Sequence, residues 1–296
     1  MRILFHNYST TTSTESRYLA ASMQNCGLQA DLWADPNVSA YDMLDSFGPD
    51  VLVSHYKFLT NDIVKYLSQS KVSLALNTTG ATQAELIGIE NLIDQGVDLK
   101  FGFSNDFKFN TKSDPNRKFK IHRLLPAADL FLAKAPRKPK EIVGVLGVDV
   151  TQEMEEIVNS KKPHHLMSLS TGSNGFDFNT NLAELSEILS FYSKILICGD
   201  HRLFSSQLFF DACLNAHSLE VLPTEESKPA WAEFLEVIFE EPPEGEDASD
   251  MTSKIKNQIL KNHTPFNRSA KMLKLLGDNE SAEKMEKMRN EVVMQP

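Results

Sequence analysis

The sequence predicts an α/β protein built from two doubly wound, Rossmann-like parallel-sheet domains. Strand-like and helix-like segments alternate from residue 2 to residue 76, and they alternate again from residue 141 to residue 222. Such alternation is typical of parallel sheets whose strands are joined by crossover helices. A basic connector separates the two stretches. We therefore expect two domains that face each other across a cleft.

The chain is 296 residues long, which is enough for two separate hydrophobic cores. The expected organisation is a first α/β domain at 1–125, a basic connector at 126–140, a second α/β domain at 141–250 and a helical tail at 251–296. The tail is rich in Lys, Glu and Met, and we expect it to cross back and pack on the first domain.

In the first domain each expected strand is a short apolar run bounded by turn residues, and Gly27 closes the first helix. A polar loop at 8–15 precedes that helix. The expected elements, in chain order, are strand 2–7, helix 16–25, strand 28–33, helix 39–47, strand 50–54, helix 61–68 and strand 72–76.

Ligands of parallel sheets bind at the carboxyl ends of the strands, so the residues that follow each strand are candidates for a site. These residues are His6, Asn7 and Tyr8 after the first strand, His55 and Tyr56 after the third, and Asn77, Thr78, Thr79 and Gly80 after the fourth.

The second domain is expected to contain a strand at 142–150, a helix at 152–160, a strand at 166–170 and a helix at 182–192. A strand at 194–198 then ends in a polar loop that starts at Gly199. Ser205 or Ser206 can cap the following helix, whose first turn offers free N–H groups to a phosphate. Asp211 lies within that helix and can accept hydrogen bonds from a ribose diol. The alternative is an ordinary strand-helix-strand unit with a solvated Asp211.

The net charge of −10 argues against indiscriminate binding to polyanions, but the charge is uneven. Ten Lys or Arg residues lie between Lys108 and Lys140, opposed by two Asp residues. This stretch is either a solvated connector or a surface for an anionic partner. Residues 236–250 are strongly acidic, and we expect a mobile loop there.

Several classes are disfavoured by what the sequence lacks. The three cysteines are scattered, which does not indicate a disulfide framework or a metal site. No apolar run reaches the roughly 20 residues of a membrane span, and we expect a cytoplasmic protein. The phosphate-loop, dinucleotide and nucleophile-elbow motifs are also missing.

Three segments together carry a resemblance. They are QLFFDACLNAHSLEV at 207–221, NHTPFNR at 262–268 and PDVLVSHY at 49–56. They resemble the CgeB-like (spore maturation protein-like) glycosyltransferases, which have the two-domain GT-B fold. The sequence departs from that family's pattern at Asp211, where the family has Glu, and at Ala216-His217, where it has Gly.

The resemblance implies metal-independent transfer of a sugar from a nucleotide-sugar, bound by the second domain, to a hydroxyl acceptor held by the first. No cofactor is implied. Arg202 and then Arg268 are the candidates for stabilising the leaving diphosphate. The implied donor-binding residues are Gly199, Arg202, Ser205, Ser206, Gln207, Asp211 and Arg268.

For the general base, His55 is the first candidate and His6 the second, because both follow strands. Either ring could instead be a hydrogen-bonded structural group. The acceptor-side candidates are Asn7, Tyr8, Tyr56, Thr78 and Thr79.

Three functions remain open at this stage. The first is a glycosyltransferase that acts on a glycan, a small molecule or a protein. The second is a phage-type enzyme that transfers a glucosyl or pentosyl group to hydroxymethylated cytosine in DNA, which the basic stretch favours and the overall acidity opposes. The third is a nucleotide-sugar-binding or assembly protein without catalysis.

Overall fold

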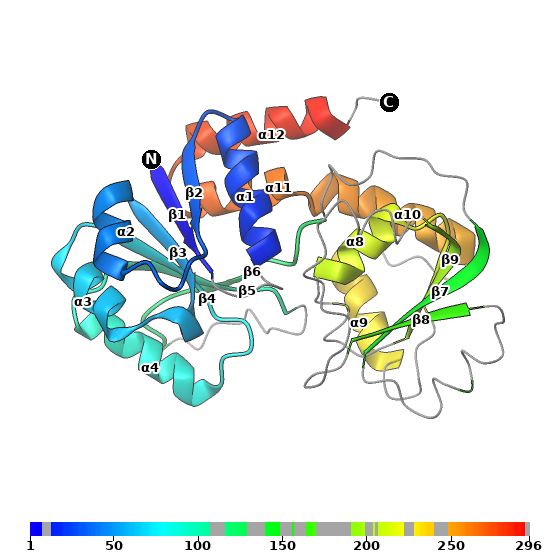
Figure 1. The fold of residues 1–296 in the computed structure, drawn as a ribbon, viewed down its shortest axis with the longest axis horizontal. Helices are drawn as coiled ribbons and strands as arrows, with labels where there is room; N and C mark the ends of the chain where they lie inside the picture. The colour runs from blue at the N-terminus through cyan, green and yellow to red at the C-terminus, as the bar shows by residue number, and fades with distance from the viewer. Residues whose placement is uncertain are drawn as a thin grey trace. The chain divides into compact units, whose positions relative to one another are not determined.

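The computed structural model describes residues 1–7, 13–106, 116–128, 140–148, 156, 164–169, 191–198, 204, 207–221, 228–239 and 248–293. The chain divides into two compact units (Figure 1). The first unit comprises Met1–Leu125 together with Pro265–Pro296, and the second comprises Pro126–Thr264. Each unit contains a sheet in which every described strand pair is parallel, which confirms the predicted α/β class.

The sheet of the first unit has the strand order β2-β1-β3-β4-β5-β6. Its strands are β1 (Arg2–His6), β2 (Gln29–Trp33), β3 (Val51–His55), β4 (Ser73–Asn77), β5 (Leu99–Ser104) and β6 (Ile121–Arg123). The register pairs His6 with Ser54 and His55 with Asn77. The carboxyl ends of these three strands therefore meet at one edge of the sheet.

The crossover helices of this unit are α1 (Ser13–Asn25), α2 (Ala40–Phe47), α3 (Asn61–Gln69) and α4 (Gln83–Asp94), and a short 3-10 helix, η1 (Tyr56–Phe58), follows β3. A polar residue immediately precedes each of α2, α3 and α4 and caps its N-terminus. Ser39 and Thr60 accept bonds from backbone N–H groups, and Thr82 forms a capping box with Glu85.

The first helix begins at Ser13, three residues before the expected start, so the predicted polar loop to residue 15 was too long. The apolar periodicity starts later than the helix because the first turn is polar and carries an acid, Glu15, which the helix dipole favours at that end. This shift places Glu15 on α1.

Helix α4 and strands β5 and β6 were not predicted. On α4 only Leu86 and Ile89 are buried, while Ile87 between them is 54% exposed, which obscures the helical period. Strand β6 has only three residues, too few for a clear pattern.

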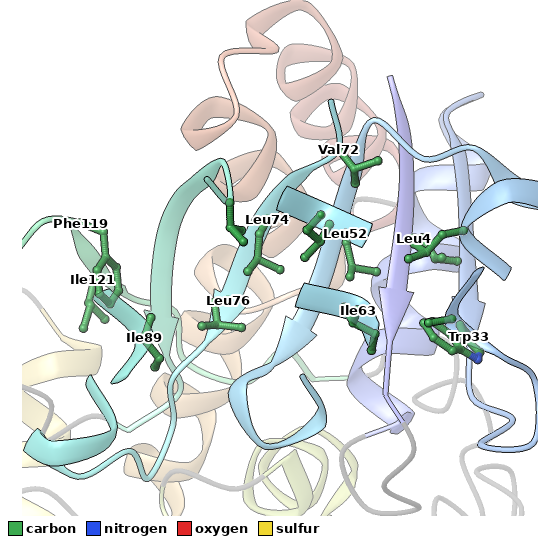
Figure 2. Packing of buried hydrophobic residues seen from close by; sticks show 14 of the residues in the cluster. Leu4, Trp33, Leu52, Ile63, Val72, Leu74, Leu76, Ile89, Phe119 and Ile121 are labelled. Carbon is green, nitrogen blue, oxygen red and sulfur yellow. The ribbon is translucent and has the colours of Figure 1, made fainter. Parts of the chain in front are cut away.

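One face of the first sheet packs against α2, α3 and α4. Leu4, Leu52 and Leu74 of neighbouring strands are fully buried there and belong to one cluster with Ile63 of α3 and Ile89 of α4 (Figure 2). Because the cluster includes residues of five strands and of α2, α3 and α4, the strand ends lie on a well-packed support.

The last two helices of the chain, α11 (Pro265–Leu275) and α12 (Asn279–Val293), belong to the first unit. Helix α11 packs on α1, where the buried hydroxyls of Ser22 and Ser269 are 2.9 Å apart. The Nζ of Lys271 donates to the carbonyl of Arg123 at 3.1 Å. Helices therefore cover both faces of the sheet.

Gly102 of β5 offers a test of this packing. A Cβ placed there would lie 2.8 Å from Cε2 of Phe119 and 3.1 Å from Cγ1 of Ile121. We expect Gly102→Ala to lower the free energy of unfolding by about 1–3 kcal/mol through overpacking.

Gly88→Ala on the exposed face of α4 is the matched control, since nothing lies within 4 Å of its Cβ. It should stabilise by about 0.5–1 kcal/mol because alanine favours helix. Urea unfolding measures both, and equal effects would contradict the packing described.

The second unit has a four-stranded sheet in the order β10-β9-β7-β8. Its elements are β7 (Lys140–Val148), β8 (His164–Leu169), β9 (Tyr192–Cys198), α8 (Gln207–Asn215), β10 (Leu219–Val221), α9 (Lys228–Ile238) and α10 (Ala248–Asn262). The predicted helices at 152–160 and 182–192 lie almost entirely outside the described residues.

Helix α10, which the sequence analysis assigned to the tail, belongs to the second unit. Thr252 Oγ1 donates to the carbonyl of Leu219 at 2.7 Å, and Lys256 donates to the carbonyl of Ala216. The tail is thus three helices, and α11 starts at Pro265 because proline is favoured at a first helical position.

The acidic segment was expected to be a loop from residue 236, but α9 continues to Ile238. Ile238 is buried, and so is Phe234 one turn earlier. The buried apolar residues of α9 therefore extend the helix to Ile238. The prediction of a loop was based on the acidic residues, which do not show where this buried face ends. Residues 240–247 lie outside the described residues.

Candidate functional site

A cavity of about 30 Å³ lies at the carboxyl ends of the first unit's strands. We call it the strand-end cavity. It offers room for about two water molecules or one small polar group. Its polar lining residues are His6 and Asn7 after β1, Glu15 and Ser16 on α1, Ser54 and His55 on β3, Asn77 on β4 and Arg268 on α11. Thus His6, Asn7, His55, Asn77 and Arg268, all predicted from the sequence as candidates, come together there.

Glu15 and Arg268 form the charged part of the cavity. The Arg268 side chain is buried, with an exposed fraction of 7%, and its Nε lies 4.0 Å from Oε1 of Glu15. Asn105 Nδ2 donates to the other oxygen, Oε2, at 3.1 Å. Burial raises the pKa of Glu15, although Arg268 and Asn105 oppose the shift. The carboxylate is therefore a stronger base than an exposed glutamate.

Sequence reasoning missed Glu15 because an acid in the first turn of a helix normally just complements the helix dipole. One signal could have found it. The first turn of the helix after β1 faces the same strand ends as His6, so its side chains belong to the same edge of the sheet.

The His6 ring is 1% exposed and stacks on Trp33, with the ring centroids 4.2 Å apart. Its Nδ1 is 2.9 Å from the Ser54 hydroxyl, which itself donates to the carbonyl of His55. A hydrogen bond therefore joins the His6 ring to the Ser54 side chain. Burial lowers the pKa of His6 to about 4, so the ring is neutral near pH 7.

His55 lies at the end of β3 with a ring that is partly buried. Its Nδ1 accepts a hydrogen bond from the backbone N–H of Lys57 at 3.2 Å, which caps η1. Burial lowers the pKa of His55, and a hydrogen bond with the backbone of Thr79 partly offsets this shift. The lone pair that a base would use is engaged with the Lys57 N–H.

The acceptor-side candidates divide into two groups. Asn7 lines the cavity and donates to Ser16 Oγ at 3.2 Å. Tyr56, Thr78 and Thr79 do not line it. Thr78 bonds the carbonyl of Phe103 at 3.1 Å through its hydroxyl, and Tyr56 donates to the carbonyl of Gly80 at 3.3 Å. Tyr8 lies outside the described residues.

Thr79 joins two strand ends. Its Oγ1 accepts from the backbone N–H of Asn105 at 2.8 Å, and its own N–H donates to Asn77 Oδ1 at 2.9 Å. Because Asn105 also bonds Glu15, this chain of contacts links the end of β4 to the carboxylate in the cavity.

Of the donor-binding candidates in the second unit, Gln207 and Asp211 are described. Asp211 is 1% exposed, and its Oδ1 accepts from Gln207 Nε2 at 3.0 Å. Gln207 also donates to the carbonyl of Ala127. The two side chains thus connect α8 to the segment before β7. Gly199, Arg202, Ser205 and Ser206 lie outside the described residues.

The basic stretch is described only in part. Within 116–128, Lys118 pairs with Asp94 at 2.6 Å, and Arg117 Nε lies 4.0 Å from Glu90. These acids on α4 reduce the local positive charge. Among the described residues no group of three metal-binding side chains is found, and no helix there is long and apolar enough to cross a membrane.

No protein-family model and no curated protein matches the chain. Among solved structures it is similar to CalG4, the calicheamicin glycosyltransferase, with 12% identity and a TM-score of 0.45 over 93% of this chain and 98% of that one. It is also similar to MurG of Acinetobacter baumannii, with 11% identity and a TM-score of 0.38 over 99% and 98%. A third similar structure is NAD⁺-bound 3-phosphoglycerate dehydrogenase of Entamoeba histolytica. Its sequence identity is 8% and its TM-score is 0.27, over 100% of this chain and 96% of that one.

Proposed function

We propose that the protein is a GT-B glycosyltransferase that moves a sugar from a nucleotide-sugar to a hydroxyl acceptor. One observation carries the proposal: a largely buried Glu15 carboxylate with a raised pKa lies beside Arg268 at the strand ends. The chain organisation supports it, since two parallel α/β units are followed by helices that return to the first unit.

In the proposed reaction the acceptor hydroxyl approaches the Glu15 carboxylate, which removes its proton. The acceptor oxygen bonds to the anomeric carbon, and the bond from that carbon to the phosphate oxygen breaks. The nucleoside diphosphate leaves with the electron pair. A buried carboxylate suits this task because burial brings its pKa closer to neutral pH.

His55 and His6, the bases expected from the sequence, take supporting roles in this proposal. His6 holds the end of β1 against Ser54 and Trp33. His55 caps η1. Both rings shape the cavity in which Glu15 acts.

The donor is placed in the second unit, where the sequence resemblance locates it. Because Asp211 is buried and bonded to Gln207, we assign it to positioning the start of α8. In the chain, that helix start follows residues 199–206, which include the remaining donor candidates, Arg202 among them.

A thermal-shift panel of UDP, GDP, CDP, ADP and dTDP tests donor binding. We expect one of them, at about 100 times its Kd, to raise the melting temperature on the order of 5 °C. Asp211→Asn, which keeps the shape of the side chain, should weaken that shift by disturbing α8. Asp62→Asn on the exposed first turn of α3 should leave it unchanged. A flat response to all five nucleotides would contradict the proposal.

A further inference from the structure

Arg268 is a buried cation with few partners. A guanidinium carries five N–H donors. Among the described residues its ion-pair partner is Glu15, whose Oε1 is 4.0 Å from Nε, beyond hydrogen-bond length. Lys271 on the same helix is a second cation close enough to interact with Arg268. The Nε atom is buried and has no hydrogen-bond partner in the described part of the chain. Burial lowers the pKa of Arg268 to about 10, so it remains charged at neutral pH.

Such an arrangement is unfavourable unless something completes it. A buried charge without hydrogen bonds is destabilising, and native proteins normally pair or solvate it. The guanidinium lines the strand-end cavity, so a ligand in that cavity can accept the unused N–H groups.

The other walls of the cavity also suit an anion. The first turn of α1, a helix of 13 residues, contributes Glu15 and Ser16 to the lining. A helix N-terminus carries partial positive charge. Asn7 and Asn77 add neutral polar groups. A volume of about 30 Å³ fits the end group of a molecule, not a whole sugar.

We propose that the strand-end cavity binds an oxyanion group of the acceptor, a carboxylate or a phosphoryl group, through Arg268. That the ligand is the acceptor rests on the proposed function, whereas the anion site itself does not. Glu15 opposes the anion by like charge and competes for Arg268. Removing the Glu15 charge should therefore strengthen anion binding, although it removes the proposed base.

Calorimetric titration with inorganic phosphate, at constant ionic strength set by chloride, tests the site. Wild type should bind phosphate, and Arg268→Gln should lose at least about tenfold in affinity because a charge-assisted bond is removed. Glu15→Gln should gain about tenfold. Arg17→Gln, which removes an exposed cation from α1, should change nothing. If phosphate fails to bind wild type and Glu15→Gln, or binds Arg268→Gln equally well, the anion site is wrong.

A second Arg268 variant and a set of three sugar ligands complete the test of the anion site. Should Arg268→Gln not fold, the gain in Glu15→Gln and the loss in Arg268→Lys, which lacks the planar fork, decide the question. Glucose, glucuronate and glucose 6-phosphate then test the acceptor. We expect the two acids to bind at least about tenfold tighter than glucose, through Arg268. Equal binding of all three would overturn the assignment to an acceptor.

The outcomes separate the two proposals. Arg268 belongs to the first unit, so its replacement should leave the nucleotide-induced thermal shift intact. If phosphate binds through Arg268 while no nucleotide raises the melting temperature, the anion site stands and the glycosyltransferase proposal fails.

Discussion

Replacing Glu15 with glutamine is expected to lower kcat for sugar transfer by about 10²–10⁴-fold, the range for loss of a general base. The amide keeps the size of the side chain and can still bond Asn105, so the fold should change little. The KM for an anionic acceptor should not rise, because the anion site gains affinity when the Glu15 charge is removed. Glu280→Gln is a matched control, because Glu280 is also a first-turn acid, on α12, and is exposed. It should retain wild-type kcat. A Glu15→Gln enzyme with more than about a tenth of the wild-type kcat would exclude Glu15 as the base.

The pH profile separates catalysis from structure. Glu15 acts only when deprotonated, so wild-type kcat/KM should rise with pH through the Glu15 pKa and then level off. Burial raises that pKa, so the rise should be centred above the ordinary 4.5. The residual activity of Glu15→Gln should lack this limb. An unchanged limb in the variant would assign it to another group.

His6 is expected to make the protein sensitive to acid. Its pKa falls from 6.5 to about 4 on burial, so the unfolded state binds the proton more readily. The contribution of the neutral His6 ring to the free energy of unfolding is fully present above pH 6.5, and it is lost as the pH falls toward 4. With about 1.4 kcal/mol per pKa unit, the loss is about 3 kcal/mol. Urea unfolding between pH 7.5 and pH 4 measures it.

His6→Gln is the control, because it removes the titration while keeping a hydrogen-bonding side chain beside Ser54. Glu15 titrates in the opposite sense, since its raised pKa favours the folded state at low pH. The contribution of His6 is therefore the difference between the wild-type and variant curves. That difference should shrink by about 3 kcal/mol from pH 7.5 to pH 4. A constant difference would contradict a neutral, buried His6.

The strands β1 to β4 were predictable because each is a short apolar run closed by turn residues. The parallel arrangement follows from their alternation with helices, and it places His6 and His55 at one edge. Strand β6 and helix α4 were missed because a three-residue strand and a helix with exposed Ile87 give weak periodic signals.

The site itself was only partly predictable. Arg268 was predicted from the sequence as a donor-binding residue, and the structure places it in the lining of the first unit's cavity, on α11, which packs on α1 through Ser22 and Ser269. Its contact with Glu15 joins segments from opposite ends of the chain. Such a pairing depends on tertiary packing, which no local pattern reveals.

The most direct test is a single-turnover measurement of nucleoside diphosphate release from the nucleotide-sugar that the thermal-shift panel identifies, with wild type and Glu15→Gln compared at saturating donor and acceptor. We predict release by wild type at least about 100-fold faster than by Glu15→Gln, with equal nucleotide affinity in the two proteins. Release at the same rate in both, or none from wild type, would contradict glycosyl transfer at the strand-end cavity.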